Sequence, residues 1–138
     1  MNPDTLIVTA RAWLGTPFHH QGRLQGVGCD CVGLVVGVAE SLGVPVQDQT
    51  GYSREPQGRA LREALDAQLR PIPAPVPGCV VLMRIGREER HVGIVATHPS
   101  TGALSLIHAW LQAGAVVEHH LDDTWRRRIV QSYEIPTL

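Results

Sequence analysis

The chain has 138 residues, which is enough for one domain with its own core, so we expect residues 1–138 to form a single domain. Hydrophobic residues make up 43% of the sequence and charged residues 18%, and 12 basic side chains against 13 acidic ones leave a net charge of -1. This balance excludes the basic footprint of a nucleic-acid-binding protein, and no apolar stretch approaches the ~20 residues of a membrane span.

The N-terminus carries no recognisable secretory signal. Asp4 and Arg11 interrupt the first 15 residues, which lack the long apolar core that such a signal needs. We therefore expect the protein to be made and folded in the cytoplasm, with any export by another route. Three cysteines, an odd number, do not indicate a disulfide framework.

Helical patterns occupy the first part of the chain. Apolar residues on one face predict a short helix over residues 5–14. Residues 15–28 form a loop with four glycines, a composition that can hold backbone close to a ligand. The next predicted helix, over 31–42, is apolar nearly all round and is therefore expected inside the molecule.

A polar connection over residues 44–57 leads to a second amphipathic helix, predicted over 58–69 from leucines at four-residue spacing. The next segment cannot be a helix, because proline lacks the N–H that a helix interior needs. It is expected to be an extended linker containing Pro71, Pro73, Pro75 and Pro77.

After the prolines the apolar pattern changes to that of strands. Strands are predicted over 79–83, 91–95, 103–109, 115–121 and 129–135, with a turn over 86–90. Helices followed by closely spaced strands predict an α+β domain, in which an antiparallel sheet packs against a buried helix near the N-terminus.

One cysteine stands at the start of the apolar helix. Asp30 occupies the N-cap position, so Cys31 falls in the first helical turn. The free N–H groups and partial positive charge of a helix N-terminus favour a thiolate, so this position predicts a lowered thiol pKa and a nucleophile. The alternative is a cysteine that only fills space, which is the role expected for Cys29 and Cys79.

A nucleophilic thiol needs a base, and two histidines lie at strand ends. His91 opens one predicted strand, and His108 lies near the end of the next. If these strands are antiparallel neighbours, His108 can contact His91 and fix the orientation of its ring, as the third member of a triad does. A structural role for both histidines fits the spacing equally well.

The other histidines include two adjacent pairs, His19-His20 and His119-His120. Neighbouring side chains of a strand point to opposite faces, so neither pair is arranged to chelate a metal. Cys29 and Cys31 form a C-x-C, but no second ligand pair has metal-site spacing. We therefore expect no metal site, and hydrolysis by a cysteine nucleophile requires no organic cofactor.

Four segments, in the same order along the chain, resemble motifs of the NlpC-type cell-wall peptidases, a branch of the papain-like cysteine peptidases. DCVGLV at 30–35 resembles the family's DCSGLV, HVGIV at 91–95 its HVGIY, and IHA at 107–109 its IHA. LGTPF at 14–18 resembles the family's GTPY lead-in. Together the matches cover about residues 5–135.

The resemblance implies a papain-like fold and a Cys-His-His triad. Cys31 is then the nucleophile, His91 the general base and later acid, and His108 the orienting residue, with the backbone N–H of Cys31 in the oxyanion hole. The implied substrate is a peptidoglycan stem peptide, cut between γ-D-glutamate and a diamino acid. Phe18 and Asp30 are then substrate-binding residues, and Asp30 either meets a free amino group of the stem peptide, serves as the N-cap, or does both.

Two positions depart from the family's pattern. Val32 stands where the family has serine and Phe18 where it has tyrosine, so two hydroxyl groups are missing from the site. These changes leave the triad in place and affect the expected rate and the bond cut.

The segments after His108 resemble the short, single-domain branch of the family that tailed phages and gene transfer particles encode. That resemblance implies action at the cell wall from a phage tail tip. Two alternatives remain at this point: a non-catalytic tail or assembly protein that keeps the fold, and an amidase or acyltransferase on the same fold.

Overall fold

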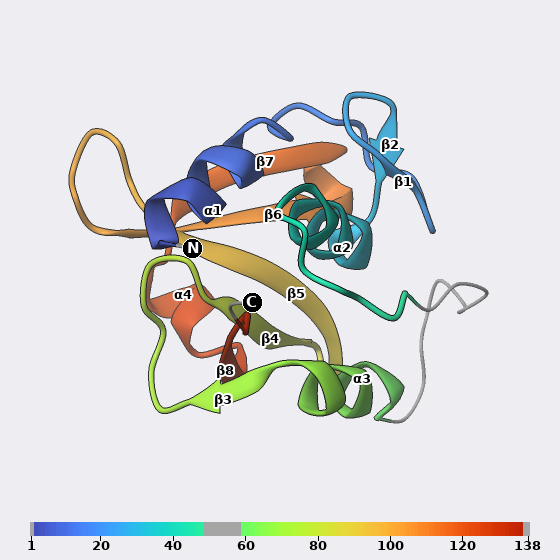
Figure 1. Cartoon of the computed structure of the whole chain (residues 1–138). Helices are drawn as coiled ribbons and strands as arrows, with labels where there is room; N and C mark the ends of the chain where they lie inside the picture. Colours follow the sequence, from blue (N-terminus) through green and yellow to red (C-terminus); the bar gives the residue numbers. More distant parts are fainter. Residues whose placement is uncertain (1, 49–58, 137–138) are drawn as a thin grey trace.

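The computed structural model describes residues 2–48 and 59–136 (Figure 1). Its helices are α1 (Pro3–Arg11), α2 (Cys31–Ser41), α3 (Ala60–Gln68), α4 (Asp123–Arg126) and the 3-10 turn η1 (Leu111–Ala113). Its strands are β1 (Arg23–Leu24), β2 (Gly28–Cys29), β3 (Arg70–Ile72), β4 (Val80–Ile85), β5 (Glu88–Thr97), β6 (Leu104–Trp110), β7 (Ala115–His120) and β8 (Ile129–Glu134). Six strands form one antiparallel sheet in the order β3-β8-β4-β5-β6-β7, and β1 pairs with β2.

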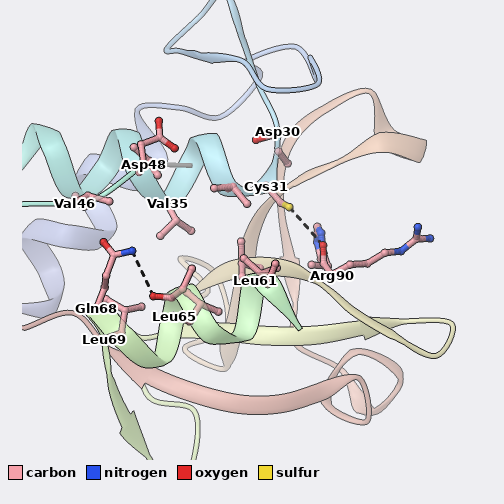
Figure 2. Close-up of a pocket in the computed structure, with 18 of the residues that line it drawn as sticks. Asp30, Cys31, Val35, Val46, Asp48, Leu61, Leu65, Gln68, Leu69 and Arg90 are labelled. Atoms are coloured by element: carbon pink, nitrogen blue, oxygen red, sulfur yellow. Dashed lines mark hydrogen bonds between the residues drawn. The ribbon is translucent and has the colours of Figure 1, made fainter. Parts of the chain in front are cut away.

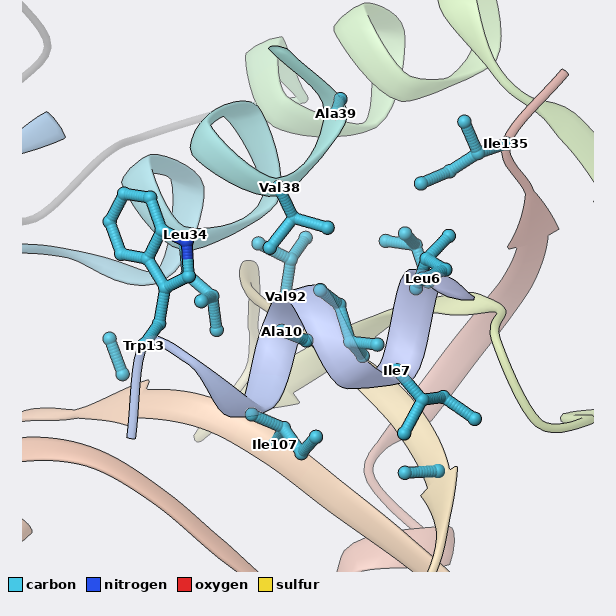
Figure 3. Close-up of a cluster of buried hydrophobic side chains, with 14 of the residues drawn as sticks. Leu6, Ile7, Ala10, Trp13, Leu34, Val38, Ala39, Val92, Ile107 and Ile135 are labelled. Carbon is cyan, nitrogen blue, oxygen red and sulfur yellow. The ribbon is translucent and has the colours of Figure 1, made fainter. Parts of the chain in front are cut away.

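Helix α2 packs on the middle of the sheet, against β5 and β6, with α1 beside it (Figure 3). Leu34 and Val38 of α2 are fully buried together with Ile107 of the sheet. Gly37 of α2 allows Trp13 to pack directly against the helix, because a Cβ on Gly37 would lie 2.2 Å from the Trp13 ring. The predicted burial of an all-apolar helix is confirmed, and so is the α+β class with its antiparallel sheet.

The other face of the sheet has a smaller apolar cluster. Met83 of β4 and Leu106 of β6 are fully buried there, and Trp125 of α4 packs against the cluster. The central strands are therefore buried on both faces, which explains why their sequences are continuous apolar runs.

Several predicted boundaries shift. The first helix runs from Pro3 to Arg11 because the side chain of Asn2 caps it, accepting a hydrogen bond from the Thr5 amide. The predicted linker is wrong at its start, since Arg70–Ile72 forms the edge strand β3 against β8. The predicted turn over 86–90 is shorter, since β5 begins at Glu88.

The helices α2 and α3 and the strands β4, β6, β7 and β8 lie within one or two residues of the predicted spans, and β5 is longer than predicted. The short strands β1 and β2 were not predicted, because they lie in the segment expected to be a glycine-rich loop. Residues 49–58, which include most of the predicted polar connection and the first residue of the predicted helix at 58, lie outside the described residues. Across 2–48 and 59–136, no helix is long and apolar enough to cross a bilayer.

Candidate active site

The start of α2 is held by Asp30. One carboxylate oxygen accepts hydrogen bonds from the Gly33 amide at 2.8 Å and from the Arg23 guanidinium at 3.0 Å, and the other accepts from the Gln21 amide at 2.9 Å. The side chain is almost fully buried. The predicted N-cap role is confirmed, and the same carboxylate ties the glycine-rich loop to the helix.

Glycines let that loop lie directly against the first turn of α2. A Cβ on Gly33 would lie 2.0 Å from the backbone oxygen of Gly22, and a Cβ on Gly22 would lie 2.6 Å from that of Gly28. The glycine-rich loop therefore brings backbone close to the helix that carries Cys31.

Cys31 is the first residue of α2 and is partly exposed. Its thiol points toward β5, with Sγ 4.0 Å from the backbone oxygen of Arg90, the residue directly before His91 (Figure 2). The helix therefore delivers the sulfur to the start of the strand that carries the expected base.

The predicted lowering of the thiol pKa is wrong for the protein without substrate. Desolvation, helped by the Asp30 carboxylate, raises the pKa of Cys31 to about 11, against the opposing effect of backbone hydrogen bonds from Val92, Val32 and Cys31. Burial and a neighbouring anion outweigh the helix end here, so the resting side chain is a neutral thiol.

His91 and His108 meet across two neighbouring strands. β5 and β6 are antiparallel, with Ile94 opposite Ile107, and Nε2 of His91 lies 2.7 Å from Nδ1 of His108. The contact that antiparallel neighbours predict is therefore present. His108 is fully buried, and Trp110 packs against both rings.

Both rings are neutral at pH 7. Burial lowers the pKa of His91 to about 3, helped by the charges of Arg128 and Arg90. Burial lowers the pKa of His108 to about 2, helped by His91, His119 and Arg128. A neutral imidazole keeps one unprotonated nitrogen and so retains the capacity to act as a base.

A cavity of about 410 Å³ opens beside the thiol, between α2 and α3 (Figure 2). Cys31, His91, Asp30 and Phe18 all border it, so the structure gathers four of the five predicted site residues at one opening. The fifth, His108, lies behind His91. Much of the remaining wall is apolar and includes Val32, Val35, Val46, Leu61, Leu65 and Leu69.

A third histidine, His119, joins His91 and His108, and the sequence did not indicate it. Nε2 of His119, on β7, lies 2.8 Å from Nε2 of His108. The sequence shows His119 only as half of an adjacent pair, because its partner is set by the register of β6 and β7. Within the described ranges 2–48 and 59–136, no group of three or more histidine, cysteine or acidic side chains is arranged to hold a metal ion.

The profile of the NlpC/P60 family matches residues 15–134, which include Cys31, His91 and His108. The chain belongs to the NlpC/P60 family. The resemblance seen in the motifs is therefore confirmed at the level of the family. No curated protein matches the sequence.

Solved structures of NlpC/P60 proteins share this fold. One is a lipoprotein-like NLP/P60 protein from Staphylococcus aureus subsp. aureus Mu50, with a TM-score of 0.69 and 14% identity over 100% of this chain and 43% of that one. The NlpC/p60 domain of the peptidoglycan hydrolase SagA matches with a TM-score of 0.67 and 18% identity, over 98% of this chain and 100% of that one. The P60 domain of an antigen from M. avium subspecies paratuberculosis matches with a TM-score of 0.64 and 16% identity, over 96% of this chain and 93% of that one. At these identities the likeness shows the fold alone, and the chain spans less than half of the Staphylococcus protein.

Proposed function

We propose that the chain is a cysteine peptidase that hydrolyses peptidoglycan stem peptides, with residues 1–138 as one peptidase domain. The observation that carries the proposal is the meeting of Cys31 and His91 at one cavity, with His91 held from behind by His108. Membership of the NlpC/P60 family supports the substrate class, as does the likeness to the domain of SagA, a peptidoglycan hydrolase.

In the first step, Sγ of Cys31 attacks the carbonyl carbon of the scissile amide and forms a thiohemiacetal-like tetrahedral intermediate. His91 takes the thiol proton at Nδ1, because its Nε2 is hydrogen-bonded to His108. The high pKa of the resting thiol means that this proton leaves together with the attack. The backbone N–H of Cys31, at the start of α2, contributes to the oxyanion hole.

In the second step, the carbon–nitrogen bond breaks, and His91 gives its proton to the leaving amine. The acyl half stays on Cys31 as a thioester. Water then attacks that thioester, again with His91 as the base, and the free acid leaves while the thiol is restored. Atoms and charge balance with water as the only co-reactant.

We assign the bond between γ-D-glutamate and a diamino acid as the one that is cut. Phe18 and Val32 border the cavity in place of the family's tyrosine and serine, so apolar contact replaces two hydroxyl groups beside Cys31. Asp30 borders the same opening while it caps α2 and pairs with Arg23, and it is the carboxylate that we assign to the free amino group of a stem peptide.

The proposed setting is the cell wall, reached from a phage tail tip. Its support is the resemblance of the segments after His108 to the short branch found in tailed phages and gene transfer particles. Co-purification of the chain with assembled tails, in a particle that encodes it, tests this setting independently of the chemistry.

Digestion of purified sacculi tests the activity. Wild-type protein, Cys31→Ala and the packing control Cys79→Ala are incubated with sacculi, and the released fragments are identified by mass. We expect split stem peptides from wild type and Cys79→Ala, and none from Cys31→Ala. Release of intact stem peptides would indicate an amidase, and release of nothing by the wild type would indicate a non-catalytic protein.

A further inference from the structure

Three histidine rings from three neighbouring strands form one continuous chain of hydrogen bonds. His91 on β5 contacts His108 on β6 at 2.7 Å, and His108 contacts His119 on β7 at 2.8 Å. This chain of hydrogen bonds ends on the backbone, since Nδ1 of His119 lies 2.9 Å from the carbonyl oxygen of His120. Every ring nitrogen after Nδ1 of His91 therefore has a partner.

When each of the three rings carries a single proton, the backbone end of this chain of hydrogen bonds fixes which nitrogen holds it. A carbonyl oxygen only accepts, so Nδ1 of His119 carries a hydrogen and its Nε2 is an acceptor. Nε2 of His108 must then donate to His119, which leaves Nδ1 of His108 as an acceptor. Nε2 of His91 must donate in turn, which leaves the lone pair of His91 on Nδ1.

We propose that His119 is a positioning residue that holds His91 in the tautomer required of a base, acting through His108. This inference rests on the proposed function, in which Nδ1 of His91 accepts the thiol proton of Cys31. A neutral His108 can carry its ring proton on Nδ1, facing His91, or on Nε2, facing His119. The acceptor on His119 decides the direction.

The register of β6 and β7 makes this contact a fixed part of the fold. His108 lies opposite Val117, and His119 is two residues further along β7 on the same face. Such diagonal neighbours are within reach of long or aromatic side chains. Trp125 packs against both the His108 and His119 rings and limits their rotation.

The surroundings of His119 hold few other charges. Glu118, its neighbour in sequence, points away to Arg11 and Ser105. Arg128 stacks over Trp125 with its guanidinium carbon 4.3 Å from the ring centre. The ring of His120 bonds instead to Thr101 and stacks on His98. His119 is partly exposed.

Three variants separate this role from a packing role. His119→Phe keeps the ring volume without an acceptor, and His119→Gln keeps an acceptor oxygen. His120→Gln is the matched control, because it removes a neighbouring ring and retains the backbone carbonyl. The proteins are compared by melting temperature, by kcat and KM on a stem peptide, and by ¹⁵N NMR of the imidazole nitrogens without substrate.

We expect ¹⁵N shifts of an unprotonated Nδ1 and a protonated Nε2 for His91 in the wild type, in His119→Gln and in His120→Gln, and a mixture of tautomers in His119→Phe. We expect kcat to fall about tenfold or more in His119→Phe with KM little changed, because a misdirected tautomer impairs the base. His119→Gln should restore kcat to within a few-fold of the wild-type value.

A protonated Nδ1 on wild-type His91 would overturn the proposal, as would equal losses of kcat in His119→Phe and His119→Gln. The NMR measurement needs no turnover. If the wild type lacks peptidase activity but shows the expected tautomers, the proposed function fails while the assignment of His119 stands.

Discussion

The two halves of the site are built in different ways. The nucleophile half depends on about ten consecutive residues, in which Asp30 caps α2, glycines admit the loop, and Cys31 follows the cap. The histidine half is assembled from β5, β6 and β7, with 17 positions between His91 and His108 and 11 between His108 and His119. One half depends on local structure and the other on sheet register.

This difference determines what each half tolerates. A helix cap contributes about 1 kcal/mol and can be weakened without moving the helix far. A one-residue slip in strand register turns a side chain to the opposite face. We therefore expect changes to the histidine half to act on chemistry and pH dependence, and changes to the nucleophile half to act on stability and thiol reactivity.

The largest effect is expected where the two halves meet. Cys31→Ala and His91→Ala should each lower kcat by about 10⁴-fold or more, because triad members act as a unit. The double variant should lose no more than either single variant. Additive losses, measured on the same stem peptide, would show that the thiol and the imidazole do not act on the same step.

Acid should destabilise the histidine half. The pKa values of His91 and His108 are lowered in the folded protein, so below about pH 6.5 the unfolded chain binds more protons and stability falls as the pH falls. With two such groups, stability should fall more steeply between pH 6 and pH 4 than it would with one. Urea unfolding at several pH values measures this slope.

The matched variant for that slope is His108→Gln, which removes one of the two titrating groups. Its slope over the same range should be about half that of the wild type. An unchanged slope would mean that other groups control the acid response.

Two glycine substitutions compare the packing of the halves. In Gly33→Ala the new Cβ would lie 2.0 Å from a backbone oxygen, whereas in Gly93→Ala it would lie 2.6 Å from the end of the Leu106 side chain and 3.2 Å from Cβ of His108. A side-chain end moves more easily than backbone, so we expect Gly33→Ala to cost about 3 kcal/mol and Gly93→Ala about 1–2 kcal/mol. Denaturant midpoints at neutral pH give the order, and the reverse order would show that the β5–β6 contact is the tighter one.

The smallest expected effect is on the reactivity of the thiol. Asp30→Asn keeps a cap at the start of α2 and removes the carboxylate that raises the pKa of Cys31. The pKa of Cys31 should therefore fall. The pH dependence of iodoacetamide labelling, followed by peptide mass, measures it, with Cys79 as the internal reference. A rise in the pKa of Cys31 would show that the loss of the Arg23 ion pair dominates.

The nucleophile half could be predicted from sequence because its determinants are local. An N-cap residue, a first-turn cysteine and an apolar run define α2 within one residue of its observed end. The error there concerns the thiol pKa, since the sequence shows the helix end but does not show the desolvation that outweighs it.

The histidine half was predicted only as far as neighbouring strands allowed. His91 and His108 follow from two consecutive strands, whereas His119 requires the register of β6 and β7, which sequence spacing does not define. Strand β3 was missed for a different reason, which is its proline. Pro71 excludes a central strand but is tolerated at the sheet edge, where it lies opposite Tyr133.

The most direct test of the hydrolase account is the mass of the intact protein, quenched with acid during turnover of a stem peptide. The account predicts an adduct equal to the acyl half of the substrate, located on Cys31 by peptide mapping and absent from Cys31→Ala. Cleavage of the peptide by Cys31→Ala at the wild-type rate would contradict it.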